Sequence, residues 1–418
     1  MTQSNFFDAI GVADMEKVHS AMIGWMLSDK CNAFEPNGKK AKSQLLQDIF
    51  QEEESARVDE FDSIKVIIEW KNIDILVVTK LKDVEKCWII ENKIKSSQHS
   101  DQLNRYVKIM DCEWQMSSRQ YLSYFKDSTK FADKAFKINP YKDKDKAYCF
   151  LSLIDEKPIA ADSVNWKCTQ YSKLAQNLEL ALRGANQTNK DYPFVSEYLS
   201  CITKLNDAIN AFLKDHKSYP NVFTDGWMQK EEKSKDYKGL NKYISENGLE
   251  TIFQKCFLSH IIPQTKFREL KDIVSETHGT ALVDFPYCSI GNTRFGFQFQ
   301  DGTFKVQVLE EYEKDDSAKI QAFLEKWEII FPKDQKQLKN TPFYGWKKNE
   351  SKEGKKAYIS ICKRQPRKSK KNPQKPWYDY GLDDIRRNWD AAFDECKSMM
   401  DKEVIPRNFN CHKKSNTI

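Results

Sequence analysis

Residues 64–94 read IKVIIEWKNIDILVVTKLKDVEKCWIIENKI. Three runs rich in β-branched residues, IKVIIEW, IDILVVT and CWIIENKI, alternate with short polar segments. Runs of this kind, separated by tight polar turns, are typical of strands that pair with their neighbours along the chain. We therefore predict a three-stranded antiparallel meander, with a first turn at Lys71 and Asn72 and a second at Lys82 and Asp83.

The second turn determines which side chains of the last two strands meet. Asp74 falls opposite Glu91, and the two side chains share one face of the sheet. Lys93 lies two residues beyond Glu91 and points to that face, whereas Asn92 points to the other. Like charges opposite each other destabilise a sheet, so a bound divalent cation is one reason for the pair. Solvated strand ends or ordinary cross-strand ion pairs are the alternative.

Helical segments flank the meander. Between residues 13 and 28 the apolar side chains recur at helical spacing, and Glu16, His19 and Ser20 line one side of that helix. A buried, hydrogen-bonded core histidine is the alternative to a site role for His19. SQLLQDIFQEEE predicts a short second helix before the strands.

After the meander, SSQHSDQLNRYVKIM predicts a helix with Gln102 and Tyr106 one turn apart. AYCFLSLID then predicts a strand buried on both faces, because it is almost continuously apolar. The predicted order is helix, three strands, helix, strand.

Together these segments resemble the PD-(D/E)XK nuclease superfamily over roughly residues 10 to 155. The residues that carry the resemblance are Asp74 in IDILVV, Glu91 and Lys93 in IIENK, Glu16 with the pair His19 and Ser20 on the first helix, and the Q-x-x-x-Y of QLNRY. More narrowly, the set looks like uncharacterised bacterial members found near defence systems, and the QxxxY spacing is similar to that of helicase-associated exonucleases. The resemblance implies an α/β restriction-endonuclease-like core, with a mixed central sheet flanked by helices in the order αβββαβ.

The resemblance also implies roles for these side chains. The implied metal ligands for Mg²⁺, with Mn²⁺ as a substitute, are Asp74, Glu91, the Asn92 carbonyl and, directly or through water, Glu16. Lys93 would orient or polarise the attacking water. The implied nucleic-acid contacts are His19, which would help place metal or phosphate, and Gln102 and Tyr106, which would hold the strand or steady Lys93. Two departures from the family pattern are Ile73, where the motif has proline, and a loop that keeps only Gly38 of a glycine-rich turn.

The character of the sequence changes beyond Pro158. WKCTQYSKLAQNLELAL and YPFVSEYLSCITKLNDAINAFLKDH have helical periodicity, and the linker-like SYPNVFTDG follows them. Further on, TRFGFQFQ and TFKVQVLEEY are β-like, and SAKIQAFLEKWEIIF and LDDIRRNWDAAFDECKSMM are helical. We predict a nuclease-like domain with a helical extension over residues 1–215 and an α+β C-terminal domain over residues 226–418, for substrate or partner recognition.

The most basic stretch, CKRQPRKSKKNPQKPWYDY, contains no acidic residue before Trp377 and Tyr378. A basic run can follow a phosphate backbone while neighbouring aromatic rings stack on bases. We therefore predict an extended, mobile loop that contacts nucleic acid through Lys368, Lys370 and Lys371. A solvated loop without a ligand is the alternative.

Composition limits the cellular setting. The 11 cysteines are scattered and never spaced as CxxC, which is typical of reduced thiols rather than of a disulfide framework or a zinc cage. MTQSNFFDAIG lacks the pattern of a signal peptide, and no run approaches the roughly 18 apolar residues of a spanning helix. We predict a cytoplasmic protein without membrane contact. The net charge of +6 is compatible with a polyanionic partner.

Three functions follow as expectations. The first is a Mg²⁺-dependent deoxyribonuclease that hydrolyses phosphodiester bonds in DNA during bacterial anti-phage defence. The second is a catalytically silent nuclease fold that binds nucleic acid. The third is an interaction protein whose C-terminal half senses a phage or host protein and whose nuclease is held inactive until then. DNA and RNA, cleavage from ends or internally, and the oligomeric state remain open at this point.

Overall fold

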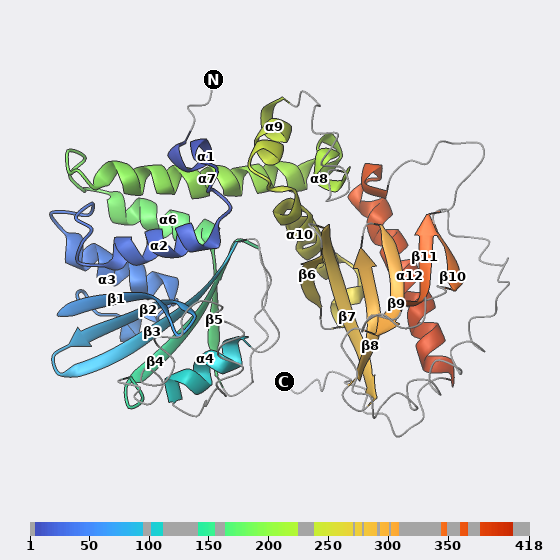
Figure 1. Ribbon diagram of the computed structural model, residues 1–418, viewed down its shortest axis with the longest axis horizontal. Helices are drawn as coiled ribbons and strands as arrows, with labels where there is room; N and C mark the ends of the chain where they lie inside the picture. The colour runs from blue at the N-terminus through green and yellow to red at the C-terminus, as the bar shows by residue number, and fades with distance from the viewer. Residues whose placement is uncertain are drawn as a thin grey trace, which may run out of the picture. The chain divides into compact units, whose positions relative to one another are not determined.

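The computed structural model divides the chain into two compact units, residues 1–208 and 209–418, and the boundary along the chain falls within helix α7 (Tyr192–Lys214). Figure 1 shows both units. The structure describes residues 5–94, 102–111, 141–154, 164–224, 238–270, 272–277, 280–290, 293–300, 302–308, 344–348, 360–366 and 377–403.

A five-stranded mixed sheet forms the centre of the first unit, in the order β1-β2-β3-β4-β5. The first three strands pair antiparallel, and β4 and β5 continue the sheet in parallel pairing from β3. The strands are β1 (Ser63–Trp70), β2 (Ile73–Leu81), β3 (Val84–Lys93), β4 (Asp145–Ser152) and β5 (Trp166–Gln170). The predicted meander is therefore confirmed, and so is the strand predicted over AYCFLSLID.

Both turns of the meander lie where the sequence predicts them. Lys71 and Asn72 connect the paired residues Trp70 and Ile73, and their φ angles are 51° and 65°. Positive φ at both central residues is the conformation of a two-residue hairpin turn, and asparagine adopts it more readily than most residues do. The second turn, at residues 82–83, connects the last pair of β2 and β3.

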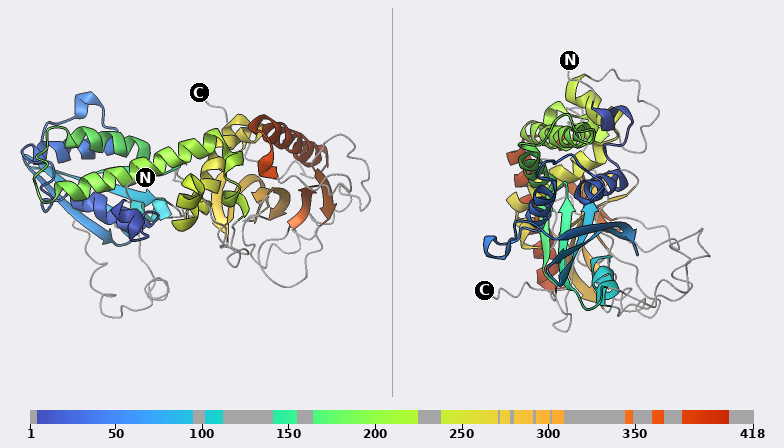
Figure 2. Two further views of the ribbon diagram at one scale, coloured as in Figure 1. Left: turned by 90° about the horizontal axis from the view of Figure 1, so that it is seen from above. Right: turned by 90° about the vertical axis from the view of Figure 1, so that its left-hand side faces the viewer.

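Helices cover the two faces of this sheet (Figures 1 and 2). The helices of the first unit are α1 (Phe6–Ala9), α2 (Glu16–Leu27), α3 (Gly38–Ile49), α4 (Gln102–Asp111) and α6 (Tyr171–Leu182), together with the first part of α7. Helix α4 lies on one face and α2, α3 and α6 on the other. The predicted helices over residues 13–28 and QLNRYVKIM are confirmed, and the short second helix begins earlier than predicted, at Gly38.

The α4 face carries an apolar core in which Leu76, Ile89, Leu103 and Phe150 are fully buried. On the opposite face, Trp88 packs edge-on against Phe50 from the end of α3. Because side chains alternate along a strand, Asp74 lies on the α4 face with Leu76, and Glu91 and Lys93 lie there with Ile89. The core thus fixes the face on which the charged groups lie.

One helix prediction is wrong at its start. WKCTQ is strand β5, and α6 begins only at Tyr171. Parallel pairing with β4 and the burial of Trp166 and Thr169 hold the five residues extended. Tertiary pairing of this kind overrides a local helical pattern.

The second unit contains a six-stranded antiparallel sheet in the order β10-β11-β9-β8-β7-β6. Its strands are β6 (Ile273–Thr277), β7 (Thr280–Ile290), β8 (Thr293–Gln300), β9 (Thr303–Val308), β10 (Tyr344–Lys348) and β11 (Ser360–Pro366). Its helices are α8 (Asn221–Thr224), α9 (Gly239–Glu246), α10 (Glu250–Ile261) and α12 (Leu382–Glu403). Phe267 packs against Phe304 and Trp389 in the core.

The predicted strands TRFGFQFQ and TFKVQV and the last helix are confirmed in this unit, whereas four of its strands went unpredicted. Part of the basic stretch is also not a loop, because residues 360–366 pair with β9 and β10. Tyr378 stacks on Phe223, with ring centroids 5.1 Å apart, and so packs within the protein. The predicted contacts Lys368, Lys370 and Lys371 and the helix predicted over SAKIQAFLEKWEIIF lie outside the described residues.

The first turn gives a test of the meander. Replacing Asn72 by valine places a β-branched residue at positive φ and should lower the free energy of unfolding by about 1 to 2 kcal/mol. Asn72→Gly is the matched control and should leave it nearly unchanged, because glycine accepts this conformation. Urea unfolding measures both values. Equal effects of the two substitutions would contradict the turn.

Candidate active site

Two carboxylates lie at the point where the β2–β3 ladder ends. The last paired residues are Ile75 and Ile90, so Asp74 and Glu91 are the next residues in register. Asp74 Oδ2 accepts a hydrogen bond from the Asn92 backbone N–H at 2.8 Å. The Asp74 side chain therefore bonds a backbone donor of β3 just beyond the last backbone pair.

Glu91 and Lys93 form a buried ion pair on the same face. Glu91 is 0% exposed and Lys93 6%, and Lys93 Nζ lies 2.6 Å from Glu91 Oε1. Within the described residues, neither Glu91 oxygen accepts a hydrogen bond of good geometry. The carboxylate is thus compensated mainly by the charge of Lys93 and retains coordinating capacity.

The pKa values of these groups reflect burial and mutual charge. Burial, reinforced by the charge of Glu91, raises the pKa of Asp74 well above its usual value. Burial also raises the pKa of Glu91, although the Lys93 ammonium opposes the rise. For Lys93, burial alone would lower the pKa, but the charges of Glu91, Glu16 and Asp74 raise it overall. The lysine therefore stays protonated at neutral pH.

Tyr106 and Gln102 lie beside the carboxylates. The Tyr106 hydroxyl donates to the Asn72 carbonyl and accepts a hydrogen bond from Gln102 Nε2 at 2.8 Å. Burial and then the charges of Glu91 and Asp74 raise the pKa of Tyr106. With its hydroxyl engaged by α4 and by the β1–β2 turn, Tyr106 is placed to position the site rather than to reach a strand of nucleic acid.

Glu16 joins helix α2 to the end of β3 at two points. Its Oε1 accepts from the Ile94 N–H at 3.1 Å, and its backbone carbonyl accepts from Asn92 Nδ2 at 3.1 Å. These bonds lie on either side of Lys93 along the chain. Of the two roles that the sequence suggests for Glu16, this geometry favours the anchor.

His19 is not a ligand-facing residue in this structure. It is 1% exposed, and its Nε2 lies 2.9 Å from the Ala13 carbonyl, so Nε2 carries the proton. Nδ1 therefore accepts from the Tyr198 hydroxyl at 3.0 Å. Burial lowers the pKa of His19 and favours this neutral form. With both ring nitrogens occupied, the contact with metal or phosphate predicted for His19 has no nitrogen available to make it.

Sequence reasoning missed Tyr171 and Tyr198. Tyr171 is fully buried, and its hydroxyl donates to Asn92 Oδ1 at 2.6 Å. Tyr198 bonds His19 from α7. Both tyrosines are far from Asn92 and His19 in the sequence, and at helical spacing they look like ordinary core residues, so no local signal marks them.

The residues present fit a divalent cation with oxygen ligands. Asp74 and Glu91 supply carboxylates, the Asn92 carbonyl is the third candidate, and the Glu91 oxygens are buried without good hydrogen bonds. Mg²⁺ is held in many proteins by one or two carboxylates together with water and phosphate oxygens. Across the described part of the chain, no group of three or more His, Cys, Asp or Glu side chains has metal-binding geometry. Besides the two carboxylates, any bound ion would therefore need the Asn92 carbonyl and oxygens from outside the protein to complete its coordination.

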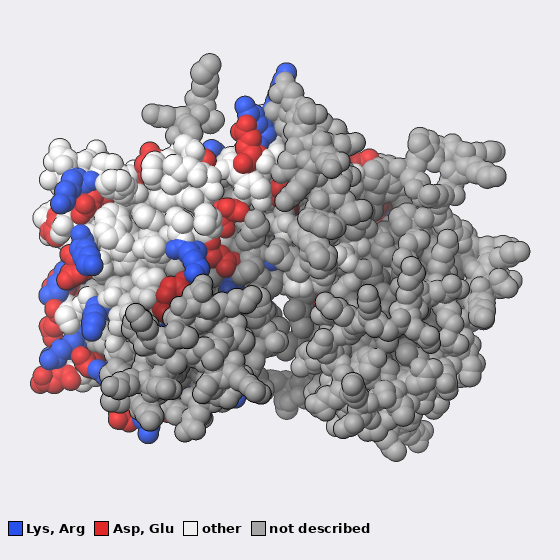
Figure 3. Space-filling view, viewed as in Figure 1, with Lys and Arg blue, Asp and Glu red and all other residues white. Residues whose placement is uncertain are grey.

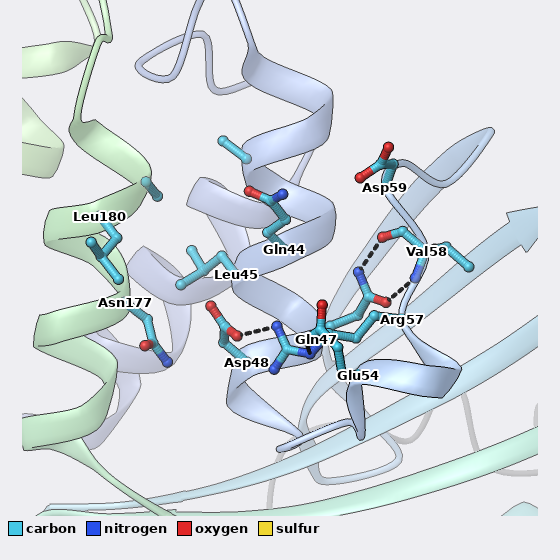
Figure 4. Close-up of a pocket in the computed structure, with 12 residues that line it drawn as sticks. Gln44, Leu45, Gln47, Asp48, Glu54, Arg57, Val58, Asp59, Asn177 and Leu180 are labelled. Atoms are coloured by element: carbon cyan, nitrogen blue, oxygen red, sulfur yellow. Dashed lines mark hydrogen bonds and ion pairs between the residues drawn. The ribbon is translucent and has the colours of Figure 1, made fainter.

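A surface pocket of about 600 Å³ between α3, α6 and the segment that precedes β1 is a separate feature (Figure 4). Gln47 bonds both backbone groups of Val58 there, at 2.8 and 2.7 Å. Asp48 pairs with Arg57 at 2.5 Å. Neither the carboxylate pair nor Lys93 lines this pocket, so the chemistry of the site does not depend on it.

Comparison with known proteins identifies the first unit. A family model of the PD-(D/E)XK nuclease superfamily matches residues 4–200. This part of the chain belongs to that superfamily. The match covers the whole mixed sheet and every residue of the site around Asp74. No curated protein and no solved structure gives a significant match to the chain.

The candidate site holds two acids whose removal should have opposite effects on stability. Asp74→Asn removes a buried charge that faces Glu91, and should raise the unfolding free energy of the metal-free protein by about 1 kcal/mol. Glu91→Gln leaves the Lys93 ammonium buried without its partner, and should lower that free energy by about 3 kcal/mol. Chemical unfolding in the presence of a chelator measures both. Equal losses for the two variants would contradict the ion-pair assignment.

The raised carboxyl pKa values set the sign of the pH dependence. The folded chain binds more protons at Asp74 than the unfolded chain does, from about pH 4 upward. The contribution of Asp74 to the unfolding free energy therefore falls as pH rises through this interval. Affinity for Mn²⁺ should rise over the same interval, because coordination requires ionised carboxylates. The difference in unfolding free energy between wild type and Asp74→Asn, measured at several pH values, isolates the contribution of Asp74. Calorimetric Mn²⁺ titrations over the same pH values give the pH dependence of the affinity.

Proposed function

We propose that this protein is a Mg²⁺-dependent nuclease that hydrolyses phosphodiester bonds in DNA. The supporting observation is the arrangement of Asp74, Glu91 and Lys93 on one face of the sheet, where the ladder between β2 and β3 ends. Two oxygen ligands and one protonated amine beside each other suit an anionic substrate and an ion. Retention of all three groups disfavours a catalytically silent nuclease fold.

Each residue of the site then has a chemical task. A bound Mg²⁺ would supply positive charge against the phosphoryl oxygens and make water more acidic. Asp74 and Glu91 would hold the ion in their ionised forms. Lys93 stays an ammonium, so it would donate hydrogen bonds to the attacking water or to a phosphate oxygen rather than accept a proton. Glu16 would keep the end of β3 in place.

The setting of this activity is also part of the proposal. The likeness to defence-associated members supports a cytoplasmic role in anti-phage defence. Among the described helices, none is long and apolar enough to cross a membrane. We propose that residues 1–215 carry the catalytic function and that residues 226–418 recognise substrate or a phage or host protein. On the face drawn in Figure 3, positive and negative side chains of the described residues are interspersed rather than separated by sign.

The direct test uses purified full-length protein with linear and circular DNA. We expect cleavage in Mg²⁺ or Mn²⁺ and none in chelator. Loss of linear DNA alone would indicate an exonuclease, and nicking of circles an endonuclease. RNA in place of DNA tests the substrate class. Absence of metal-dependent cleavage of any nucleic acid, with and without extracts of phage-infected cells, would reject the nuclease.

Lys93→Met separates metal binding from catalysis. The variant keeps the length of the side chain and removes its charge, so the rate of cleavage should fall at least about a hundredfold. Mn²⁺ binding should be retained or tightened, because Glu91 no longer pairs with an internal cation. Lys86→Met is the matched control, since Lys86 lies on the same strand and pairs with Glu52 at 2.8 Å. Comparable rates for the two variants would contradict the role of Lys93.

A further inference from the structure

The Asn92 side chain lies on the opposite face of β3 from the carboxylate pair. Its Nδ2 donates to the Glu16 carbonyl at 3.1 Å and to Ser20 Oγ at 3.0 Å, and its Oδ1 accepts from the Tyr171 hydroxyl at 2.6 Å. The residue is 0% exposed, and Ser20 and Tyr171 are buried as well. Every polar atom of this amide therefore has a partner within the protein.

The backbone of the same residue belongs to the site. The Asn92 N–H donates to Asp74 Oδ2 at 2.8 Å. Backbone pairing between β2 and β3 has ended by this point, whereas pairing with β4 continues at Asn92 and Leu151. On the β2 side the strand is therefore held at this position by a side-chain contact. Hydrogen bonds to the Asn92 side chain from the other face add to the ladder with β4 in placing it.

We propose that the buried side-chain amide of Asn92, held by hydrogen bonds to Tyr171 and Ser20, positions the catalytic end of β3. The inference rests on the proposed nuclease function and concerns how that site is held. Asn92 links these hydrogen bonds to the site because its side chain faces α2 and α6 while its backbone N–H faces Asp74. Tyr171 and Ser20 act through Asn92 and are positioning residues, since neither touches the carboxylate pair.

The partners of Tyr171 support this role. The Tyr171 ring packs edge-on against His19, with centroids 5.4 Å apart, and His19 is in turn bonded to Tyr198 and Ala13. The packing of the Tyr171 ring against the hydrogen-bonded His19 therefore holds the Tyr171 hydroxyl in position to bond Asn92. A satisfied buried network of this kind specifies one arrangement, because each broken bond leaves an unpaired polar group in the core.

The network gives a residue-level test. Tyr171→Phe keeps the ring and removes the bond to Asn92, and Ser20→Ala removes a second bond to the same amide. In metal-free protein, we expect several-fold faster hydrogen–deuterium exchange in a peptide covering residues 88–94 for both variants. The Mn²⁺ dissociation constant should rise about tenfold. In the double variant the increase should differ from the product of the single effects, because both bonds act through one side chain.

Thr79→Val is the matched control. Thr79 accepts a hydrogen bond from Trp88 Nε1 at 2.8 Å on the same face of the sheet, and valine has nearly the same shape. This variant loses a buried hydrogen bond without touching Asn92, so exchange near residue 92 and Mn²⁺ affinity should stay at wild-type values. Equal shifts in all three variants, or no shift in Tyr171→Phe and Ser20→Ala, overturn the inference. If the two variants show faster exchange than the wild type, but wild-type protein neither binds Mn²⁺ nor cleaves nucleic acid, the nuclease function is rejected while the positioning of β3 by this network is retained.

Discussion

Two carboxylates that face each other at the end of a ladder of strand hydrogen bonds are the constraint on which the first unit depends. Burial and like charge both disfavour Asp74 and Glu91 in their ionised forms, and the pKa values of both are raised as a result. The Lys93 ammonium and the Asn92 N–H are the compensating groups that the structure supplies. Both groups belong to β3, so the placement of this strand determines whether the acids can be held together.

The polar side chains on the two faces of β3 differ in how fully they are hydrogen-bonded. Toward α2 and α6, the Asn92 amide has all of its hydrogen bonds satisfied by the protein. Toward α4, the oxygens of Glu91 are buried with no well-formed hydrogen bond within the described residues. A satisfied network rigidifies a strand, whereas a buried carboxylate that is compensated mainly by one ammonium costs stability and retains the capacity to bind a cation. A reactive group needs rigid support, and in β3 the hydrogen-bonded Asn92 amide on one face can supply that support to Glu91 on the other.

The second unit differs from the first in the pairing of its strands and in its core. Its sheet is antiparallel throughout the described strands, and an aromatic core around Phe267 and Trp389 joins it to α12. Among the described residues of this unit, as in the first, no group of three or more His, Cys, Asp or Glu side chains could hold a metal ion.

The sequence by itself determined the meander, its two turns and the face that Asp74, Glu91 and Lys93 share, because two-residue turns and strand alternation are local rules. It could not determine β5, since only pairing with β4 makes WKCTQ extended. Nor could it distinguish a buried His19 from one that faces a ligand, or connect Tyr171 with Asn92 across 79 positions of the chain. Those relations were decided by the tertiary structure, because they arise from packing α2, α6 and α7 against the sheet, and local sequence patterns carry no record of which distant side chains meet.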